Sequence, residues 1–367
     1  MRKKKIYIYY ASIGSGHLVA ARSIAQSLHN LDKTLIVETY DIFNNKNKKF
    51  FIQEFSVFIS NFLFPEIYSW IWKTGALKWL YNLATLIGPW QGSIMTKLRI
   101  AKPDLVICTH TLPCSIAARF KNDNPTMRLI AVPTDLFIHH YWPLKNVDAF
   151  IAPNDSTKDE LMRRGFSERK IFTYGIPVSP EIKKYLTNKS ALKQQNIIVL
   201  AGGYRVAPYF SIHSRVEVII EFLKSHRNDL IHWQFVFGNS KKMKEKADVN
   251  LIKRDDIELF GFIDNVQKMI AQSVLVFTKP GGLTVAEAIS MNKPIILLSK
   301  GAGQERANSK YVVDSKAGIL LDDDKKLYQY LKELYQNPNL QRKVFHPSKI
   351  NFLNSAERIA KLAKKLL

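Results

Sequence analysis

A pair of adjacent glycines in the second half of the chain marks the stretch whose chemistry is easiest to infer. Residues 278–288 follow an apolar run typical of a strand, 274–277, and continue into good helix formers. Gly281 and Gly282 let the backbone approach a bulky ligand, and the first turn of the helix offers unpaired N–H groups to a phosphate. Glu287 lies about one and a half turns into this helix, where its carboxylate can reach a ribose hydroxyl beside the phosphate. We therefore expect a nucleotide diphosphate site, with an ordinary strand-to-helix turn as the alternative.

A second polar loop follows the next predicted strand, 294–298. After the glycine-containing stretch 301–303 it carries Gln304 and Glu305, with Asn308 one helical turn later. An amide and a carboxylate suit sugar hydroxyls, which need both hydrogen-bond donors and acceptors. Because α/β sheets bind ligands at the carboxyl ends of their strands, two such loops in succession favour a binding function over simple turns.

The first predicted strand runs into a glycine loop that ends in a histidine. Gly14 and Gly16 match half of a dinucleotide-binding fingerprint, but Val19 occupies the third glycine position, which argues against bound NAD. His17 stands at the start of the helix predicted for 18–28. Imidazole titrates near neutral pH, so this loop is better described as a turn with a functional histidine at its tip.

Two further loops of the first half, 109–111 and 133–135, also follow predicted strands and carry polar groups. The histidines nearby raise the question of a metal. His139 and His140 are adjacent and would point apart in a strand, and no histidine and carboxylate stand at ligand spacing. We therefore expect no metal site.

Length and composition indicate a folded, basic protein. The 367 residues can form two domains, and 46% of them are hydrophobic. The formal net charge of +23 implies a polyanionic neighbour. The sequence has no zinc spacing, RNP-like aromatic signature or groove-reading basic helix, so an anionic membrane surface is favoured over nucleic acid. Cys108 and Cys114 are too few for a disulfide framework, fit a reducing cytoplasm and are expected in the core.

The N-terminus imitates a secretory signal, because the basic residues 2–5 precede the apolar run 6–10. The run is too short and leads into glycines, so we interpret it as the first strand. The most apolar longer stretch, 55–72, contains Pro65 and Glu66 and is not expected to cross a bilayer.

The segment 50–90 is rich in aromatic residues and holds four of the chain's six tryptophans. Lysines such as Lys73 and Lys78 lie between them. Aromatic and apolar residues at helical spacing with interleaved lysines suit helices in a membrane interface. A helical hairpin packed on the sheet is the alternative. We expect partial exposure and peripheral attachment to the cytoplasmic face of the membrane, where each lysine or arginine near anionic lipid contributes roughly 1 kcal/mol.

Strand-like and helix-like segments alternate along both halves, which predicts two doubly wound parallel sheets of the α/β class. The predicted strands are 6–10, 35–41, 104–108, 129–132, 149–152 and 170–174, then 196–200, 233–237, 274–277 and 294–298. The proline-rich link 175–180 separates the halves, which sets domains at 1–176 and 177–350 and a basic amphipathic helix at 351–367. The basic run 241–246 is interpreted as a solvated helix face.

The motif of residues 278–288, followed by a strand and then Gly303-Gln304-Glu305, resembles the donor-binding half of the family 28 glycosyltransferases. It is most similar to the glycolipid synthases that move glucose or galactose from a UDP-sugar to diacylglycerol. The family's Gly-x-Gly-His loop matches residues 14–17. The resemblance covers nearly the whole chain and implies the GT-B fold, two Rossmann-like domains facing across a cleft. The first domain of such enzymes binds the acceptor and the second the UDP-sugar.

On the donor side, the resemblance implies that a helix start and a cation stabilise the departing UDP without a metal, and that the UDP-sugar is a co-substrate with no further cofactor. Separate groups would contact phosphate, uracil, ribose and hexose. The implied donor-binding residues are Gly202, Gly203 and Arg205 for the phosphates, Phe262 and Ile263 for uracil, Gly281, Gly282, Leu283 and Thr284 at the helix start, Glu287 for ribose, and Gln304 and Glu305 for the hexose.

On the acceptor side, the resemblance implies that His17 takes the proton of the attacking alcohol. Asp135 is either a rival base or the carboxylate that orients His17. The implied acceptor-binding residues are Gly14, Ser15, Gly16, His110 and Trp142. Direct displacement by one alcohol would invert the anomeric carbon.

Two other enzymes of the same architecture stay open at this point. One is the transferase that adds N-acetylglucosamine to a polyprenyl-linked peptidoglycan precursor, which usually has more glycine in its first-domain loops. The other is a UDP-N-acetylglucosamine 2-epimerase, which needs several carboxylates and no aromatic membrane segment. The sequence does not decide between glucose and galactose.

Overall fold

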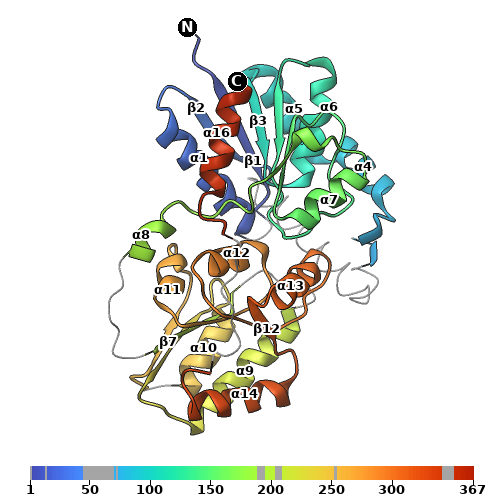
Figure 1. Cartoon of the computed structure of the whole chain (residues 1–367). Coiled ribbons are helices and arrows are strands. Elements are labelled where there is room, and N and C mark those ends of the chain that lie inside the picture. The colour runs from blue at the N-terminus through green and yellow to red at the C-terminus, as the bar shows by residue number, and fades with distance from the viewer. Residues whose placement is uncertain are drawn as a thin grey trace. The chain divides into compact units, whose positions relative to one another are not determined.

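In the computed structural model the chain folds into two compact units (Figure 1). Unit 1 comprises residues 1–180 and 352–367, and unit 2 comprises residues 181–351. The chain leaves unit 1 after Pro180 and returns to it at Phe352. The structure describes residues 2–12, 15–43, 70–71, 73–187, 195–202, 209–251, 254–340 and 351–367.

Unit 1 is built on a parallel sheet whose six described strands have the order β2-β1-β3-β4-β5-β6. These strands are β1 (Lys5–Tyr10), β2 (Ile36–Asp41), β3 (Leu105–Cys108), β4 (Arg128–Ala131), β5 (Ala149–Ala152) and β6 (Ile171–Thr173). Strands β3 and β5 are buried along their whole length, as expected for strands covered on both faces. Successive residues of β1 enter different cores, Ile6 and Ile8 on one face and Tyr7 and Tyr9 on the other.

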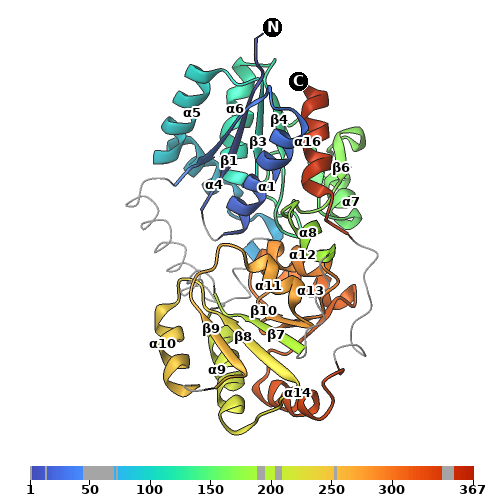
Figure 2. The same ribbon diagram turned by 90° about the vertical axis from the view of Figure 1, so that its left-hand side faces the viewer.

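Helices cover both faces of this sheet (Figure 2). They are α1 (Gly16–Leu31), α4 (Lys78–Ile87), α5 (Pro89–Ala101), α6 (Thr111–Asp123), α7 (Asp155–Arg163) and α16 (Ser355–Leu366), with a short 3-10 turn at Glu168–Lys170. Helices α1 and α16 share the core of Ile6 and Ile8, whereas α5 and α6 join the core of Tyr7 and Tyr9. Cys108 and Cys114 are buried free thiols, which confirms the prediction that they lie in the core.

The C-terminal segment is tied to unit 1 where the chain first leaves it. The ring of Phe352 packs on Gly175, and the hydroxyl of Ser355 donates to the Gly175 carbonyl oxygen at 2.8 Å. Helix α16 then lies beside α1, with an ion pair of 2.8 Å between Lys364 and Asp32 (Figure 1). The two segments that link the units are thus held together at one point of unit 1.

Unit 2 repeats the architecture with six described parallel strands in the order β12-β11-β10-β7-β8-β9. They are β7 (Gln195–Leu200), β8 (Ile231–Val236), β9 (Ile257–Phe260), β10 (Leu275–Thr278), β11 (Ile295–Leu297) and β12 (Gly318–Leu320). The helices are α8 (Ile182–Thr187), α9 (Tyr209–Ser225), α10 (Lys241–Asn250), α11 (Val266–Gln272), α12 (Gly282–Ser290), α13 (Gln304–Asp314) and α14 (Asp324–Gln336). The predicted pair of doubly wound α/β domains is confirmed.

Each sheet has one point at which the order of its strands reverses. In unit 1 this point lies between β1 and β3, and in unit 2 between β7 and β10. Loops at the carboxyl ends of the strands diverge there, which makes it the usual ligand site of open α/β sheets. Some of the predicted site residues follow these same strands, and the others follow β4, β9 and β11.

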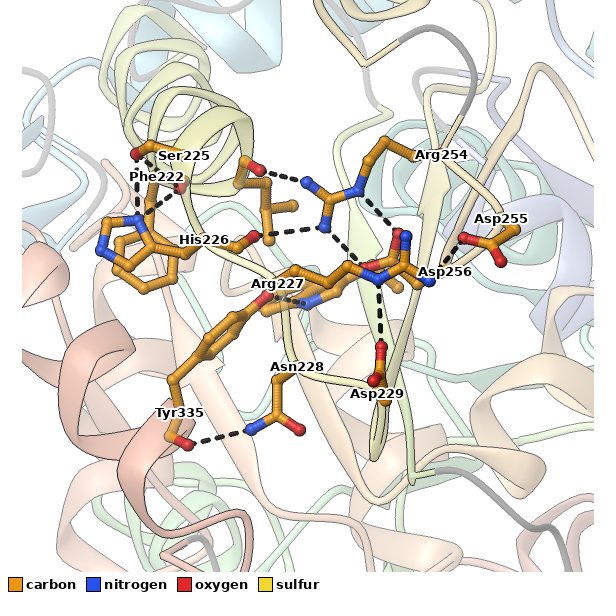
Figure 3. Close-up of polar contacts among 12 residues, drawn as sticks. Phe222, Ser225, His226, Arg227, Asn228, Asp229, Arg254, Asp255, Asp256 and Tyr335 are labelled. Carbon is orange, nitrogen blue, oxygen red and sulfur yellow. Dashed lines mark hydrogen bonds and ion pairs between the residues drawn. The ribbon is translucent and has the colours of Figure 1, made fainter.

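A dense polar network with a structural role lies at the amino ends of the unit 2 strands, away from the predicted site residues (Figure 3). Arg254 donates to both carboxylate oxygens of the buried Asp256, at 2.7 and 2.6 Å, and to the carbonyl oxygens of Leu223 and His226 at 2.5 and 3.2 Å. These carbonyls belong to the end of α9 and the loop after it, where backbone acceptors have no helical donor. Arg254 therefore caps α9 and fastens it to the start of β9.

Candidate active site

His17 lies in the first turn of α1, after the carboxyl end of β1. Its Nδ1 is 2.8 Å from the backbone carbonyl oxygen of Thr109, in the loop after β3. A carbonyl oxygen can only accept a hydrogen bond, so Nδ1 carries the proton and the lone pair is on Nε2. The hydroxyl of Thr134, after β4, is 3.0 Å from the same nitrogen, and the Thr109 hydroxyl donates to the His17 carbonyl oxygen at 3.1 Å. Loops after three strands thus fix one tautomer of this ring.

Burial lowers the pKa of His17 to about 4, and the hydrogen bond to the Thr109 carbonyl opposes this shift only in part. The imidazole is therefore neutral at physiological pH. A neutral ring with a free Nε2 lone pair can accept a proton from an alcohol.

Two further histidines lie close to His17 and are held neutral by the same cause. The His110 ring meets that of His17 edge to face, with centroids 4.8 Å apart. Its Nδ1 accepts from the Leu112 N–H at 3.1 Å and so caps α6. Burial lowers the pKa of His110, and burial followed by the charge of Arg164 lowers the pKa of His139 to about 3.

His139 and His140 lie in the loop after β4 and not in a strand, His139 buried and His140 half-buried. Among the described residues, no three histidine, cysteine, aspartate or glutamate side chains gather closely enough to hold a metal ion.

The other residues expected on the acceptor side have different surroundings. Asp135 directly follows Thr134 and is half-buried, but the orienting contact to Nδ1 of His17 comes from the Thr109 carbonyl. Trp142 is 4% exposed and packs edge to face on Phe150 within the core, which leaves its ring little surface to offer an acceptor. Ser15 is exposed just before α1, Gly16 is the first residue of α1, and Gly14 lies outside the described residues.

In unit 2 the adjacent glycines form the start of α12. Gly281 is the N-cap residue, and the Val285 N–H donates to its carbonyl oxygen at 2.9 Å. The N–H groups of Gly282, Leu283 and Thr284 precede this bond and have no acceptor within the helix. Three donors unpaired within the helix, at the positive end of its dipole, are what an anion site needs.

Glu287 lies in the second turn of α12 and is 2% exposed. Its Oε1 accepts a hydrogen bond of 2.8 Å from Nε2 of Gln267 in α11. Burial raises the pKa of this carboxyl to about 7, and the bond from Gln267 lowers it in part. A buried carboxyl group with a raised pKa near a helix start marks a candidate ligand-binding site.

The residues expected to contact the hexose are joined to the glycine turn. Glu305 forms an ion pair with Lys279, which precedes the glycines, and the Asn308 side chain donates to the Pro280 carbonyl oxygen at 3.0 Å. The buried Oε1 of Gln304 has no hydrogen-bond partner within the described part of the chain. These contacts bring the loops after β10 and β11 together.

The remaining donor-side residues follow the neighbouring strands. Gly202 follows β7, and a Cβ there would lie 3.2 Å from the backbone of Gly238 after β8. The Gly238 N–H donates to the Gly261 carbonyl oxygen at 3.1 Å, next to Phe262, which is 64% exposed, and Ile263, which is half-buried. Gly203 and Arg205 lie outside the described residues.

Some residues that complete these contacts were not singled out from the sequence. Thr109 and Thr134 stood only within predicted polar loops, and their hydrogen bonds to His17 join residues far apart in the chain. Gln267 gave no signal, because a glutamine near the start of a helix is usually solvated. Lys279 was part of the glycine motif, and its charge opposite Glu305 could have suggested the ion pair.

The two six-stranded parallel α/β units are those of the GT-B type glycosyltransferase fold. Residues 17–178 match the monogalactosyldiacylglycerol (MGDG) synthase family, and residues 197–363 match the glycosyltransferase family 28 C-terminal domain. The chain belongs to glycosyltransferase family 28 and is a UDP-sugar hexosyltransferase.

Known proteins match nearly the whole chain, in sequence or in structure. A processive diacylglycerol beta-glucosyltransferase of Staphylococcus haemolyticus is 25% identical over 354 residues, covering 91% of this chain and 85% of that protein. The structure of S. aureus MnaA with UDP aligns with a TM-score of 0.66 at 16% identity, covering 99% of this chain and 98% of that one. A putative UDP-N-acetylglucosamine 2-epimerase from Listeria monocytogenes gives 0.65 at 16% identity, covering 99% and 96%. Likeness at this low identity to the two solved structures shows the fold alone.

Proposed function

We propose that the protein transfers glucose or galactose, with inversion, from a UDP-sugar to the free hydroxyl of a diacylglycerol-type lipid at a membrane surface. The observation that carries this proposal is the neutral His17, whose Nδ1–H is held by the Thr109 carbonyl so that Nε2 is free to accept a proton. The named relatives support the choice of acceptor, because they are diacylglycerol glucosyltransferases.

In the proposed reaction the lipid hydroxyl gives its proton to Nε2 of His17 as its oxygen attacks the anomeric carbon. General-base assistance of this kind contributes about 10² to 10⁴ in rate. The new carbon–oxygen bond forms on the face opposite the departing UDP, so an α-linked donor yields a β-glycoside. Asp135 stays the rival base, since it lies next to Thr134 in the same loop.

The departing UDP gains negative charge as its bond to the sugar breaks. The N–H groups of Gly282, Leu283 and Thr284, which the helix itself does not pair, can donate to this diphosphate. Glu287 would accept from ribose, and Gln304 and Glu305 from the hexose. This scheme needs no metal ion, so transfer should persist in the presence of a chelator.

The described part of the aromatic segment supports attachment to a membrane. Helix α4 exposes Trp79, Leu83 and Ile87, at 65%, 44% and 76%, although they are apolar. Its inner face is anchored instead, by a hydrogen bond of 3.1 Å from Tyr81 to Thr111. An apolar helix face on a strongly basic protein fits the interface of an anionic bilayer.

Membrane contact would make the protein peripheral on the cytoplasmic face. Within the described residues, no helix has the length and apolar content to span a bilayer. Residues 50–69 and 72 of the predicted segment lie outside the described part.

Direct assay of transfer tests the proposal. The protein is incubated with labelled UDP-glucose, UDP-galactose or UDP-N-acetylglucosamine and with diacylglycerol in anionic liposomes, and the lipids are then resolved. We expect label in a glycosyl-diacylglycerol from one of the first two donors. Label from UDP-N-acetylglucosamine alone, or conversion of that donor without transfer, would instead favour the polyprenyl-linked acceptor or the epimerase.

A further inference from the structure

The two carboxylate oxygens of Glu287 have different surroundings. Oε1 accepts from the side chain of Gln267 at 2.8 Å, and both side chains are buried. Oε2 takes no part in this hydrogen bond. Oε2 is therefore the carboxylate oxygen that remains to accept from a ligand hydroxyl.

The position of Glu287 along α12 directs that oxygen towards the anion site. Side chains of a helix lean towards its N-terminus, so the carboxyl group lies back over the preceding turn. That turn contains Leu283 and Thr284, whose N–H groups have no acceptor within the helix. In a nucleoside diphosphate the ribose hydroxyls lie one sugar ring away from the first phosphate. A ligand of this kind can therefore contact both the N–H groups of the first turn and the Glu287 carboxyl group above it.

We infer that Gln267 is a positioning residue for the nucleotide, which holds Oε1 of Glu287 and thereby directs Oε2 to a ribose hydroxyl. This inference rests on the proposed function, because it takes ribose to lie at Glu287. As a consequence, the Gln267–Glu287 pair selects ribonucleoside diphosphates over deoxyribonucleoside diphosphates.

The chemistry of an amide suits this task. Gln267 donates through an uncharged N–H, so it fixes the carboxylate without neutralising it as a lysine or arginine would. Helix α11 also begins directly after the loop of Phe262 and Ile263, the residues expected to contact uracil. One short helix therefore positions both the base-binding loop and the carboxylate for ribose.

The experiment compares affinities for UDP, 2′-deoxy-UDP and 3′-deoxy-UDP by titration calorimetry on the full chain. For the native protein we expect UDP to bind at least about tenfold more tightly than one of the two deoxy analogues, as is usual for a hydrogen bond to a charged acceptor. Gln267→Met keeps the length of the side chain and removes its donor. It should bring this ratio close to one while changing the affinity for that deoxy analogue by less than about threefold.

Gln272→Met is the matched control, because Gln272 lies at the exposed end of the same helix and should leave the ratio unchanged. If Gln267→Met does not fold, as judged by thermal melting, Gln267→Ala replaces it.

A variant that weakens all three ligands equally, with the ratio preserved, would show that Gln267 only supports the fold and would overturn the inference. A native protein that binds UDP but does not discriminate between UDP and the deoxy analogues would also overturn the inference. The proposed transfer activity would be unaffected by this result, because the liposome assay tests it separately. A native protein that binds no UDP would overturn both.

Discussion

The Nδ1 atom of His17 lies 2.8 Å from the carbonyl oxygen of Thr109, a contact that leaves the lone pair on Nε2, as the proposed role of a base requires. The carbonyl fixes the proton on Nδ1, and burial keeps the ring neutral. Both the Thr109 carbonyl and the Thr134 hydroxyl contact Nδ1 of this ring.

Removal of the His17 ring should slow transfer strongly without weakening the binding of the donor. We expect His17→Ala to lower kcat by at least about 10²-fold, the usual contribution of a general base, and to leave UDP affinity within about twofold, since the donor site is assigned to unit 2. His29→Ala, at the exposed end of the same helix, is the control. Transfer of radiolabel measures kcat, and calorimetry measures the affinity for UDP. A fully active His17→Ala would assign the role of general base to Asp135.

The carboxyl of Glu287 should make donor binding depend on pH. Its folded pKa is raised to about 7 by burial, so it is protonated below that pH and ionised above it. Ribose hydroxyls donate best to the ionised form, so affinity for UDP-glucose should rise with pH up to about 7 and then level off. UDP-glucose is the right probe because, unlike UDP, it has no phosphate that titrates in this range. Glu287→Gln should bind more weakly above pH 7 and lose the dependence, and a native profile that is flat from pH 5 to 8 would contradict the ribose role.

The strands that form the two cores could be predicted, because most are short apolar runs buried on both faces. Strands β5 and β7 match their predicted bounds to within one residue. Strands β9 and β12 were missed, and both lie at an edge of the unit 2 sheet. In β9 the exposed Glu258 interrupts the apolar pattern, and β12 is only three residues long and begins with glycine.

The contacts within the site could be predicted only in part. Local motifs located Gly281, Gly282 and Glu287, because the turn and the helix are encoded by neighbouring residues. The partners of His17 could not be found this way, since Thr109 is 92 positions away and is brought close by the parallel pairing of β1 and β3. Such contacts depend on tertiary packing and leave no periodic trace in the sequence.

The link between the units should be sensitive at Gly175. This residue has a φ of +85°, and a Cβ there would lie 2.2 Å from the ring of Phe352. Gly165 offers a matched control, because its φ is +83° and nothing lies within 4 Å of an added Cβ. Gly165→Ala should cost about 1 kcal/mol through backbone strain alone, and Gly175→Ala should cost clearly more. Denaturant unfolding measures both, and equal losses would mean that Phe352 moves aside freely.

The pair of Arg254 and Asp256 should contribute strongly to the stability of unit 2. Asp256 is 2% exposed, and the hydrogen bonds from Arg254 hold the pKa of its carboxyl below the usual value. Arg254→Ala would leave a buried charge unpaired and should cost about 3 kcal/mol or more at pH 7.

A group with a depressed pKa stabilises the fold above its unfolded pKa and loses this effect as the pH falls. The difference between the native protein and Arg254→Ala should therefore shrink below about pH 4, the ordinary pKa of an aspartate. Arg227→Ala, whose ion pairs to Asp229 and Asp255 are exposed, should leave the melting temperature unchanged. A constant difference across pH would show that Arg254 acts through the α9 carbonyls and not through Asp256.

The exposed face of α4 should determine attachment to lipid. Trp79, Leu83 and Ile87 are apolar and exposed, whereas Thr85 on the same helix is buried and accepts a hydrogen bond of 2.8 Å from Arg119. Replacing the three apolar residues by serine should leave the fold intact and reduce flotation with liposomes by about tenfold or more, since each large apolar side chain inserted contributes roughly 1.5 to 3 kcal/mol. Val249→Ser, an exposed apolar position on α10 of unit 2, is the control.

Binding of the native protein should also require anionic lipid and fall as salt rises, because salt screens the attraction between the lipid and the net charge of +23. Flotation that ignores both the triple substitution and the lipid charge would mean that α4 is not the membrane contact.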